Sequence, residues 1–199
     1  MSLTAIIRAL SRARLPILTF AVTYFISVLV GVLMVHTGNE FALTYRDDLV
    51  ERAQANEPAL LALGQNERLR AALFDFGGNL AAGIGQTVAG LGVIAPYPIA
   101  AFRGWVGGIV SVNSVHVSRL ASSSEALYYL SVVILQLIPY SLAGGAGVNL
   151  GIACFRPPPN YQGAKLLWLP KEALRDVLRI YILVVPLFFI ASLLEFLAR

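Results

Sequence analysis

Residues 15–36 read LPILTFAVTYFISVLVGVLMVH, a run of 22 residues without Asp, Glu, Lys or Arg. A helix of this length extends about 33 Å, slightly more than the roughly 30 Å hydrocarbon core of a bilayer. The apolar part of a signal peptide is shorter and ends at a small-residue cleavage motif such as A-x-A, which does not follow here. The run therefore predicts a first transmembrane helix.

The segment before this run, residues 1–14, combines three arginines with apolar side chains at helical spacing. Arg8, Arg12 and Arg14 alternate with residues such as Leu3 and Ile7. A basic amphipathic helix of this kind lies in the plane of the membrane surface. We expect such a helix over residues 1–14.

The composition of the whole chain extends the membrane interpretation. Of the 199 residues, 57% are hydrophobic and 13% are charged, whereas soluble domains carry about 25% charged residues. The net charge of +4 comes from basic residues beside apolar runs, without the basic stripe and interleaved aromatics of a nucleic-acid-binding surface. We therefore expect membrane lipids, and no nucleic acid, as partners.

Downstream of the first span, residues 37–76 form the only substantial polar segment. Its partial helical periodicity predicts amphipathic helices pressed on the outer face of the membrane. Apolar runs then follow over residues 77–95, 99–117, 126–155 and 177–198. The predicted fold is all-α: a polytopic transmembrane helical bundle of about five spans with amphipathic interfacial helices, in which residues 77–199 form the main bundle.

Proline and glycine residues mark the expected turns and breaks. Pro96 and Pro98 predict a turn between two spans, and Arg103 after them suits an inner-face loop. Pro139 and the glycines after it predict a kink or break in the long run at 126–155. Trp168, in the polar loop before the last span, suits an interfacial anchor.

Basic residues set the expected orientation, because cytoplasmic loops are enriched in Lys and Arg. A cytoplasmic N-terminus places nine of the 15 basic residues on the inner side. These are Arg8, Arg12, Arg14, Arg103, Arg156, Lys165, Lys171, Arg175 and Arg179. We expect a multi-pass protein of the bacterial inner (cytoplasmic) membrane with its N-terminus in the cytoplasm.

Thirteen of the 17 glycines fall within residues 77–151. Small residues at four-residue steps let membrane helices approach closely, as in the GxxxG motif. The candidate helix-packing residues are Gly85, Gly104, Gly108, Ala143, Gly147 and Gly151. Such faces serve either tight packing within the chain or a seam with a partner or second copy.

Polar residues inside apolar runs are the other candidate functional residues, because they are costly in hydrocarbon. The candidates are Asn79, Gln86, Gln136, Asn149 and Glu195. They serve either as interhelical hydrogen-bonding groups or as part of a transport or proton path. The two histidines, His36 and His116, are far apart, and Cys154 is the single cysteine, so we expect no metal site.

The sequence contains no GxxxxGK[ST] phosphate loop, no HExxH and no GxSxG motif. We therefore expect neither an enzyme nor a bound cofactor.

Three segments resemble the stage II sporulation protein M (SpoIIM-like) family. They are LFDFGGNL at 73–80, IPYSLAGGAGVNLG at 138–151 and IASLLEF at 190–196. The chain departs from the family where the long helix begins, since a family glutamate corresponds to Gln136 here and no histidine precedes it. The resemblance implies a non-enzymatic membrane protein; in spore formers the named member helps hold a peptidoglycan-remodelling complex.

Two functions remain open at this point. The first is a membrane scaffold or accessory subunit that binds other membrane proteins or itself through glycine-rich helix faces. The alternative is a permease-like subunit of a transporter energised by a separate ATPase or an ion gradient, since discontinuous helices build transporter sites.

Overall fold

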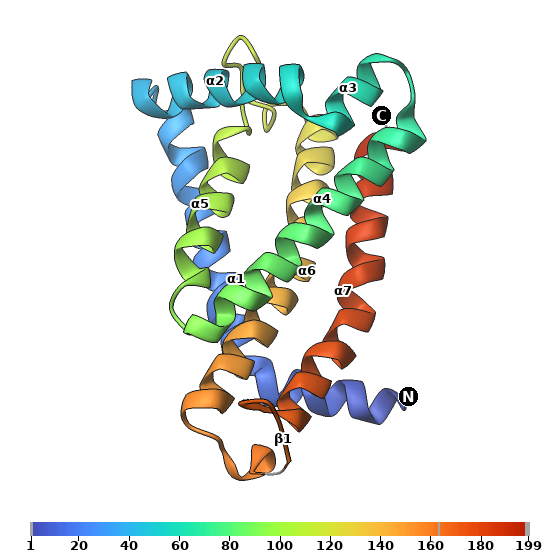
Figure 1. Ribbon diagram of the computed structural model, residues 1–199. Coiled ribbons are helices and arrows are strands. Elements are labelled where there is room, and N and C mark those ends of the chain that lie inside the picture. Colours follow the sequence, from blue (N-terminus) through green and yellow to red (C-terminus); the bar gives the residue numbers. More distant parts are fainter. Residues whose placement is uncertain (1, 163, 198–199) are drawn as a thin grey trace.

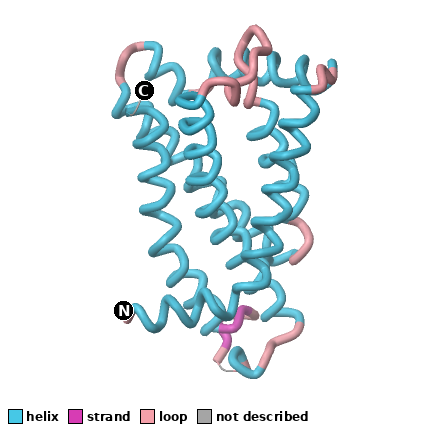
Figure 2. Tube along the Cα trace, turned by 180° about the vertical axis from the view of Figure 1, so that it is seen from behind, coloured by secondary structure: helices cyan, strands magenta, loops and turns pink. Residues whose placement is uncertain are grey.

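The computed structural model describes residues 2–162 and 164–197, which form an almost entirely helical chain (Figures 1 and 2). The predicted all-α class is confirmed. In the described part the α-helices are α1 (Leu3–His36), α2 (Glu40–Asn56), α3 (Pro58–Gly64), α4 (Arg68–Ala89), α5 (Pro96–Ile109), α6 (Ser123–Phe155) and α7 (Lys171–Leu197). Two short 3-10 helices, η1 (Gly90–Gly92) and η2 (Pro159–Tyr161), and two strands, β1 (Lys165–Leu166) and β2 (Leu169–Pro170), complete it.

Helix α1 contains both the expected surface segment and the first span in one continuous helix. Its N-terminal arm, which is the part of α1 before Pro16, lies across one end of the bundle, and the rest runs along the bundle axis (Figure 1). Pro16 lies inside α1 and cannot donate the helical hydrogen bond at its position, which accounts for the bend.

Helices α2 and α3 lie across the opposite end of the bundle (Figure 1). The side chain of Asn39 caps α2 by accepting a hydrogen bond from the backbone N–H of Ala42 at 3.0 Å. Pro58 begins α3 at a position where its missing N–H costs no helical hydrogen bond. The polar segment therefore forms a helical layer over this end of the bundle.

Helices α4 and α5 differ from the spans expected at 77–95 and 99–117. Helix α4 begins earlier, at Arg68, and ends at Ala89, so the turn falls before Pro96. Pro96 and Pro98 lie in the first turn of α5, where proline is tolerated. The hairpin of α4 and α5 turns back before the end of the bundle at which the N-terminal arm lies (Figures 1 and 2).

Three helices of the described chain, α1, α6 and α7, are long and apolar enough to cross a membrane. The expected number of about five spans is therefore not confirmed. Helix α4 carries two arginines and Asp75, and the 14 residues of α5 extend only about 21 Å.

Helix α6 forms the centre of the bundle and contacts α1, α4 and α7. It continues through Pro139 and the glycines without interruption, so the predicted break is wrong. Almost every side chain from Pro139 to Gly151 is buried, because small residues admit neighbouring helices on all sides.

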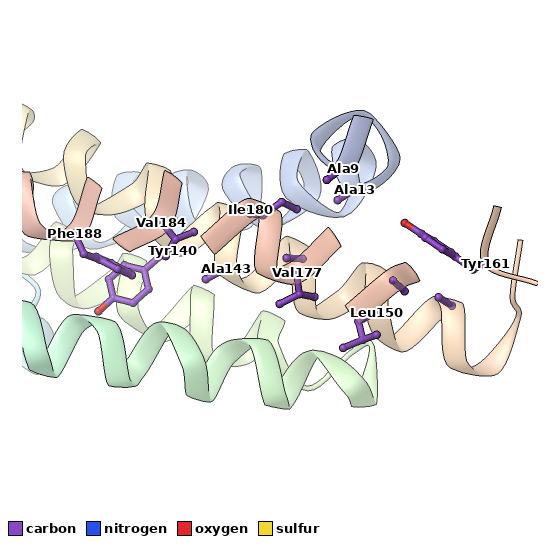
Figure 3. Close-up of a cluster of buried hydrophobic side chains, with 13 residues drawn as sticks. Ala9, Ala13, Tyr140, Ala143, Leu150, Tyr161, Val177, Ile180, Val184 and Phe188 are labelled. Carbon is purple, nitrogen blue, oxygen red and sulfur yellow. The ribbon is translucent and has the colours of Figure 1, made fainter. Parts of the chain in front are cut away.

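The main hydrophobic cluster joins α6 to α7 and to the N-terminal arm (Figure 3). Tyr140 of α6 and Phe188 of α7 meet edge to face with ring centroids 4.7 Å apart. Ala9 and Ala13 seat the arm against the same cluster. This packing fixes the three apolar helices relative to one another and positions the polar groups described next.

Candidate functional site

Gly104 and Gly108 of α5 lie directly against the backbone of α1. A Cβ atom added at Gly104 would collide with the carbonyl oxygen of Tyr24, and one at Gly108 with that of Val28. Gly31 of α1 faces α5 at the same contact. This GxxxG pair is used for packing inside the chain.

Gly147 and Gly151 of α6 lie equally close to the end of α4 and to η1. A Cβ atom at Gly147 would come within 2.6 Å of Thr87 Cα, and one at Gly151 would collide with the Gly90 carbonyl. The buried Ala143 belongs to the same contact, since Thr87 Oγ1 donates a hydrogen bond to its carbonyl at 2.9 Å. Five of the six candidate packing residues therefore touch helices of their own chain.

Gly85 differs from the other five. Within the described residues, an added Cβ atom at Gly85 or at Gly77 would meet nothing within 4 Å. Ala81 lies between them at four-residue spacing and is also exposed. We call Gly77, Ala81 and Gly85 the α4 outer face; it is a strip of small residues on the surface of the bundle.

A chain of hydrogen bonds crosses the bundle from α5 to α7. Its members, which we call the polar relay, are Arg103, Tyr140, Asn79, Asp75 and Ser192. Arg103 Nη1 donates to Tyr140 Oη at 2.7 Å, and Tyr140 Oη donates to Asn79 Oδ1 at 2.6 Å. Asn79 Nδ2 then donates to Asp75 Oδ2 at 2.8 Å, and Ser192 Oγ donates to the same oxygen at 2.6 Å.

The polar relay places a cation at one end and a carboxylate near the other, with a phenol and an amide between them. Hydrogen bonds to charged groups are stronger than those between neutral groups, and successive bonds polarise one another. The Arg103 guanidinium also lies 4.6 Å from the centroid of the Tyr140 ring. Arg103 is therefore a bundle residue of α5, and its predicted place in an inner-face loop is wrong.

Gln136 and Glu195 form a second polar contact, between α6 and α7. Gln136 Nε2 donates to Glu195 Oε2 at 3.0 Å, and Tyr128 Oη donates to the Glu195 backbone carbonyl at 2.7 Å. These side chains and Arg119 line a pocket of about 130 Å³. At about 30 Å³ of liquid volume per water molecule, the pocket has room for a few waters.

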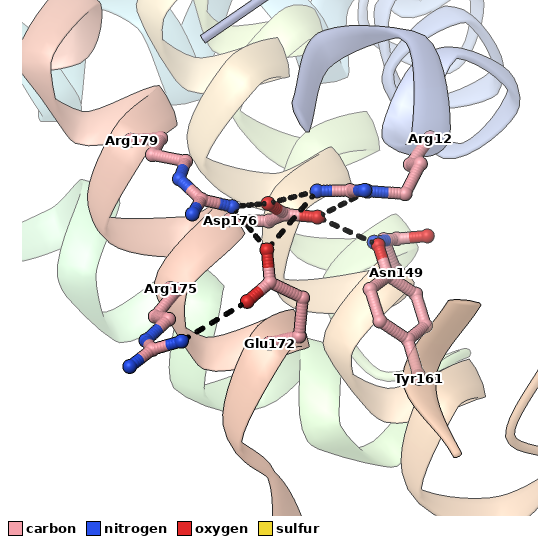
Figure 4. Close-up of polar contacts among 7 residues, drawn as sticks. All are labelled: Arg12, Asn149, Tyr161, Glu172, Arg175, Asp176 and Arg179. Carbon is pink, nitrogen blue, oxygen red and sulfur yellow. Dashed lines mark hydrogen bonds and ion pairs between the residues drawn. The ribbon is translucent and has the colours of Figure 1, made fainter. Parts of the chain in front are cut away.

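Asn149 belongs to a third group, at the end of the bundle where the arm lies (Figure 4). Its Nδ2 donates to Tyr161 Oη at 2.9 Å, and Tyr161 Oη donates to Asp176 Oδ2 at 2.9 Å. The Asp176 carboxylate is 1% exposed and also accepts bonds from Arg12 and Arg179, each at 2.6 Å. We call this set the Asp176 cluster; it ties the arm to α7 and to the loop before it.

The five predicted polar residues therefore lie in four separate places. Asn79 belongs to the polar relay, Gln136 and Glu195 to the pocket, and Asn149 to the Asp176 cluster. Gln86 is 2% exposed, and neither polar atom of its amide has a hydrogen-bond partner in the described part of the chain.

The loop after α5 is fastened to α2 by His116, whose Nε2 lies 2.8 Å from Asp47 Oδ2. Arg46 donates to the other oxygen of Asp47 at 2.8 Å. This hydrogen bond, with a smaller contribution from His116, holds the pKa of Asp47 below its ordinary value. The contact couples the helical layer to the hairpin of α4 and α5.

Several residues of these groups were missed in the sequence. Asp75 falls within the polar segment expected at the outer face (37–76), although it precedes Asn79 by four residues and shares its helix face. Tyr140 and Ser192 lie in apolar runs where nothing local distinguishes them. The pairing of Arg12 with Asp176 joins residues 164 positions apart, which no local pattern predicts.

The family model described as stage II sporulation protein M matches residues 20–197. No curated protein and no solved structure matches the chain.

Proposed function

The chain belongs to the stage II sporulation protein M family, and from this premise we propose that it acts as a non-enzymatic membrane scaffold or accessory subunit. Its apolar helices and its family both indicate a membrane protein. The partner would be another membrane protein or a second copy of the chain. The binding surface would be the α4 outer face.

The open space at Gly77 and Gly85 is the observation that supports this surface. Helices in lipid associate through close backbone approach, which small residues at four-residue steps permit. The other candidate glycines are already covered by α1, α4 or η1, so they have no free face for a partner. The neighbouring Ile84 and Val88 are 48% and 60% exposed and would flank an incoming helix.

The distribution of charge supports a cytoplasmic N-terminus in an inner membrane. The end of the bundle that holds the arm carries eight basic residues and only two acidic residues, Glu172 and Asp176. The basic residues are Arg8, Arg12, Arg14, Arg156, Lys165, Lys171, Arg175 and Arg179. An excess of Lys and Arg on one side marks the cytoplasmic side.

Site-specific photo-crosslinking in native membranes tests the binding surface. A photo-reactive residue at position 81 is expected to form a crosslinked product, either a dimer or an adduct with another membrane protein. The matched control carries the same residue at position 22, which is 46% exposed on α1. The product at position 81 should disappear when Gly85→Leu is added, because the side chain would hold a partner helix away.

Absence of any product at position 81, or equal products at positions 81 and 22, would contradict the proposal. Insensitivity of the product to Gly85→Leu would contradict it as well, since the contact would then not depend on close approach.

A permease-like subunit is the second candidate, and the polar relay favours it. Tyr140 and Asn79 each accept a hydrogen bond from one side and donate one to the other across the bundle. Polar and ionisable groups inside a membrane bundle mark substrate and ion pathways. A cysteine at position 79 or 136, in a Cys154→Ser background, would react with a membrane-impermeant thiol reagent if an aqueous path reaches it. Reaction with the reagent as slow as that of Val22→Cys, on the apolar surface of α1, would exclude this candidate.

A further inference from the structure

Strands β1 and β2 form a small hairpin whose tip is apolar and exposed. Lys165 pairs with Pro170 and Leu166 with Leu169, which leaves Leu167 and Trp168 at the turn. Leu167 is 89% exposed and Trp168 is 55% exposed. Large apolar side chains at the tip of a loop are poorly placed in water, so the tip calls for an apolar environment.

The backbone holds these side chains out at a conformational cost. Leu167 has a φ of +58°, in the left-handed region that turns normally fill with Asn, Asp or Gly. A strained backbone at an exposed apolar residue points to a function for the position. In this conformation the Leu167 side chain is exposed and not packed against the bundle.

The hairpin lies at the same end of the bundle as the N-terminal arm, as both views show (Figures 1 and 2). The arm exposes Leu3 and Ile7, which are 72% and 56% exposed, together with Arg8 and Arg14. The hairpin is flanked by the exposed lysines Lys165 and Lys171. Both features therefore combine apolar side chains with cations, as segments that lie in a membrane interface do.

We propose that the hairpin at 165–170 inserts Leu167 and Trp168 into the interfacial region of the lipid leaflet, while Lys165 and Lys171 bind acidic phospholipid headgroups. Tryptophan is enriched at this depth because its ring is apolar and its N–H is polar. Lysine side chains bury their apolar stems and keep the ammonium group at headgroup level. The charge excess at this end of the bundle matches an anionic leaflet.

The chain offers its own reporter for this proposal. It contains two tryptophans, Trp105 and Trp168, so Trp105→Phe leaves Trp168 as the only indole. The variant is reconstituted in vesicles of zwitterionic lipid with and without phosphatidylglycerol. We expect blue-shifted Trp168 emission, quenching by shallow-labelled lipids more than by deep-labelled lipids, and little quenching by aqueous iodide.

Water-like Trp168 emission with strong iodide quenching in both vesicle types would overturn the proposal. This is the result expected if the hairpin tip binds a protein partner and stays in water without it. Deep quenching without a preference for shallow labels would also overturn the interfacial placement.

The lysines are tested by titrating phosphatidylglycerol against the detergent-solubilised Trp105→Phe chain and following Trp168 emission. Each lysine near an acidic lipid surface strengthens binding about fivefold. The double variant Lys165→Gln with Lys171→Gln should therefore raise the phosphatidylglycerol concentration at the midpoint about 25-fold. The matched control is Arg52→Gln with Arg70→Gln at the opposite end, both exposed, which should leave the midpoint unchanged.

An equal midpoint in both double variants would overturn the headgroup assignment. Saturation by inorganic phosphate at the same midpoint would overturn a lipid in favour of a free anion. These readouts do not depend on the α4 outer face, so they stand or fall separately from the proposed scaffold function.

Discussion

Gly107 and Gly108 are neighbours in α5, yet they face different surroundings, and alanine at each gives a matched test of the contact between α1 and α5. At Gly108 an added Cβ would collide with the Val28 carbonyl and come within 2.8 Å of Gly31 Cα and Val32 N. These are backbone atoms that cannot rotate away, so the two helices must separate. At Gly107 the nearest atoms are Tyr24 Oη at 3.7 Å and Val28 Cγ2 at 3.9 Å, which is ordinary contact.

The expected magnitudes follow from two opposing terms. Replacing glycine by alanine inside a helix favours folding by about 0.5–1 kcal/mol. Overpacking a tight contact costs about 1–3 kcal/mol. Gly107→Ala should therefore be neutral or stabilising by up to about 1 kcal/mol, and Gly108→Ala should be about 1–3 kcal/mol less stable than Gly107→Ala.

The free energy of unfolding is measured by denaturing detergent titration of the purified chain in mixed micelles, followed by far-ultraviolet circular dichroism. The sign of the difference between the variants is the result that matters. Equal free energies of unfolding for Gly107→Ala and Gly108→Ala would refute the close backbone contact.

Three further outcomes are expected from the same assay. Tyr140→Phe breaks two bonds of the polar relay and leaves their partners unmatched, so it should cost about 1–3 kcal/mol, more than Tyr129→Phe, which loses one bond to the Gly107 carbonyl. Asp176→Asn leaves two arginines without their buried carboxylate, so it should lower the free energy of unfolding by about 3–5 kcal/mol and speed tryptic cleavage in the arm. The control Asp48→Asn, at an exposed ion pair, should lower the free energy of unfolding by less than about 1 kcal/mol and leave the cleavage unchanged. Because folding lowers the pKa of Asp47, the stability that Asp47 contributes is complete above its ordinary pKa of 3.8 and is lost as pH falls through the folded-state pKa. Asp47→Asn should therefore weaken the loss of stability at acid pH. An unchanged pH dependence would contradict the contact with Arg46.

Apolar length and composition predicted the helical class and the three long helices, since hydropathy over some 20 residues is a local property. They also predicted two helices joined by a turn over residues 77–117, but they placed the turn and the bounds of α4 and α5 wrongly. Pro96 and Pro98 suggested a turn, but proline also suits the first turn of a helix, and the structure uses it there. Pro139 suggested a break, but α6 continues through it.

The sequence marks candidate residues, but it does not mark their partners. Asn79 is polar in an apolar run, and that alone marks it. Tyr140 of α6 connects Asn79 to Arg103 of α5, and this connection depends on how three helices pack. A single sequence carries no signal for that geometry. The glycine spacing likewise marks close contacts without saying which helix fills them; only the structure separates the covered Gly108 from the open Gly85.

The bond between Arg12 and Asp176 also has a consequence for biogenesis. The two residues lie 164 positions apart, so at about 5–20 residues per second the ribosome needs about 10–30 s after Arg12 to make its partner. Throughout that interval the Asp176 carboxylate that binds Arg12 has not yet been synthesised. Completion of the fold at this end therefore waits for the last helix, and a ribosome-stalled chain ending before α7 should leave the arm open to protease.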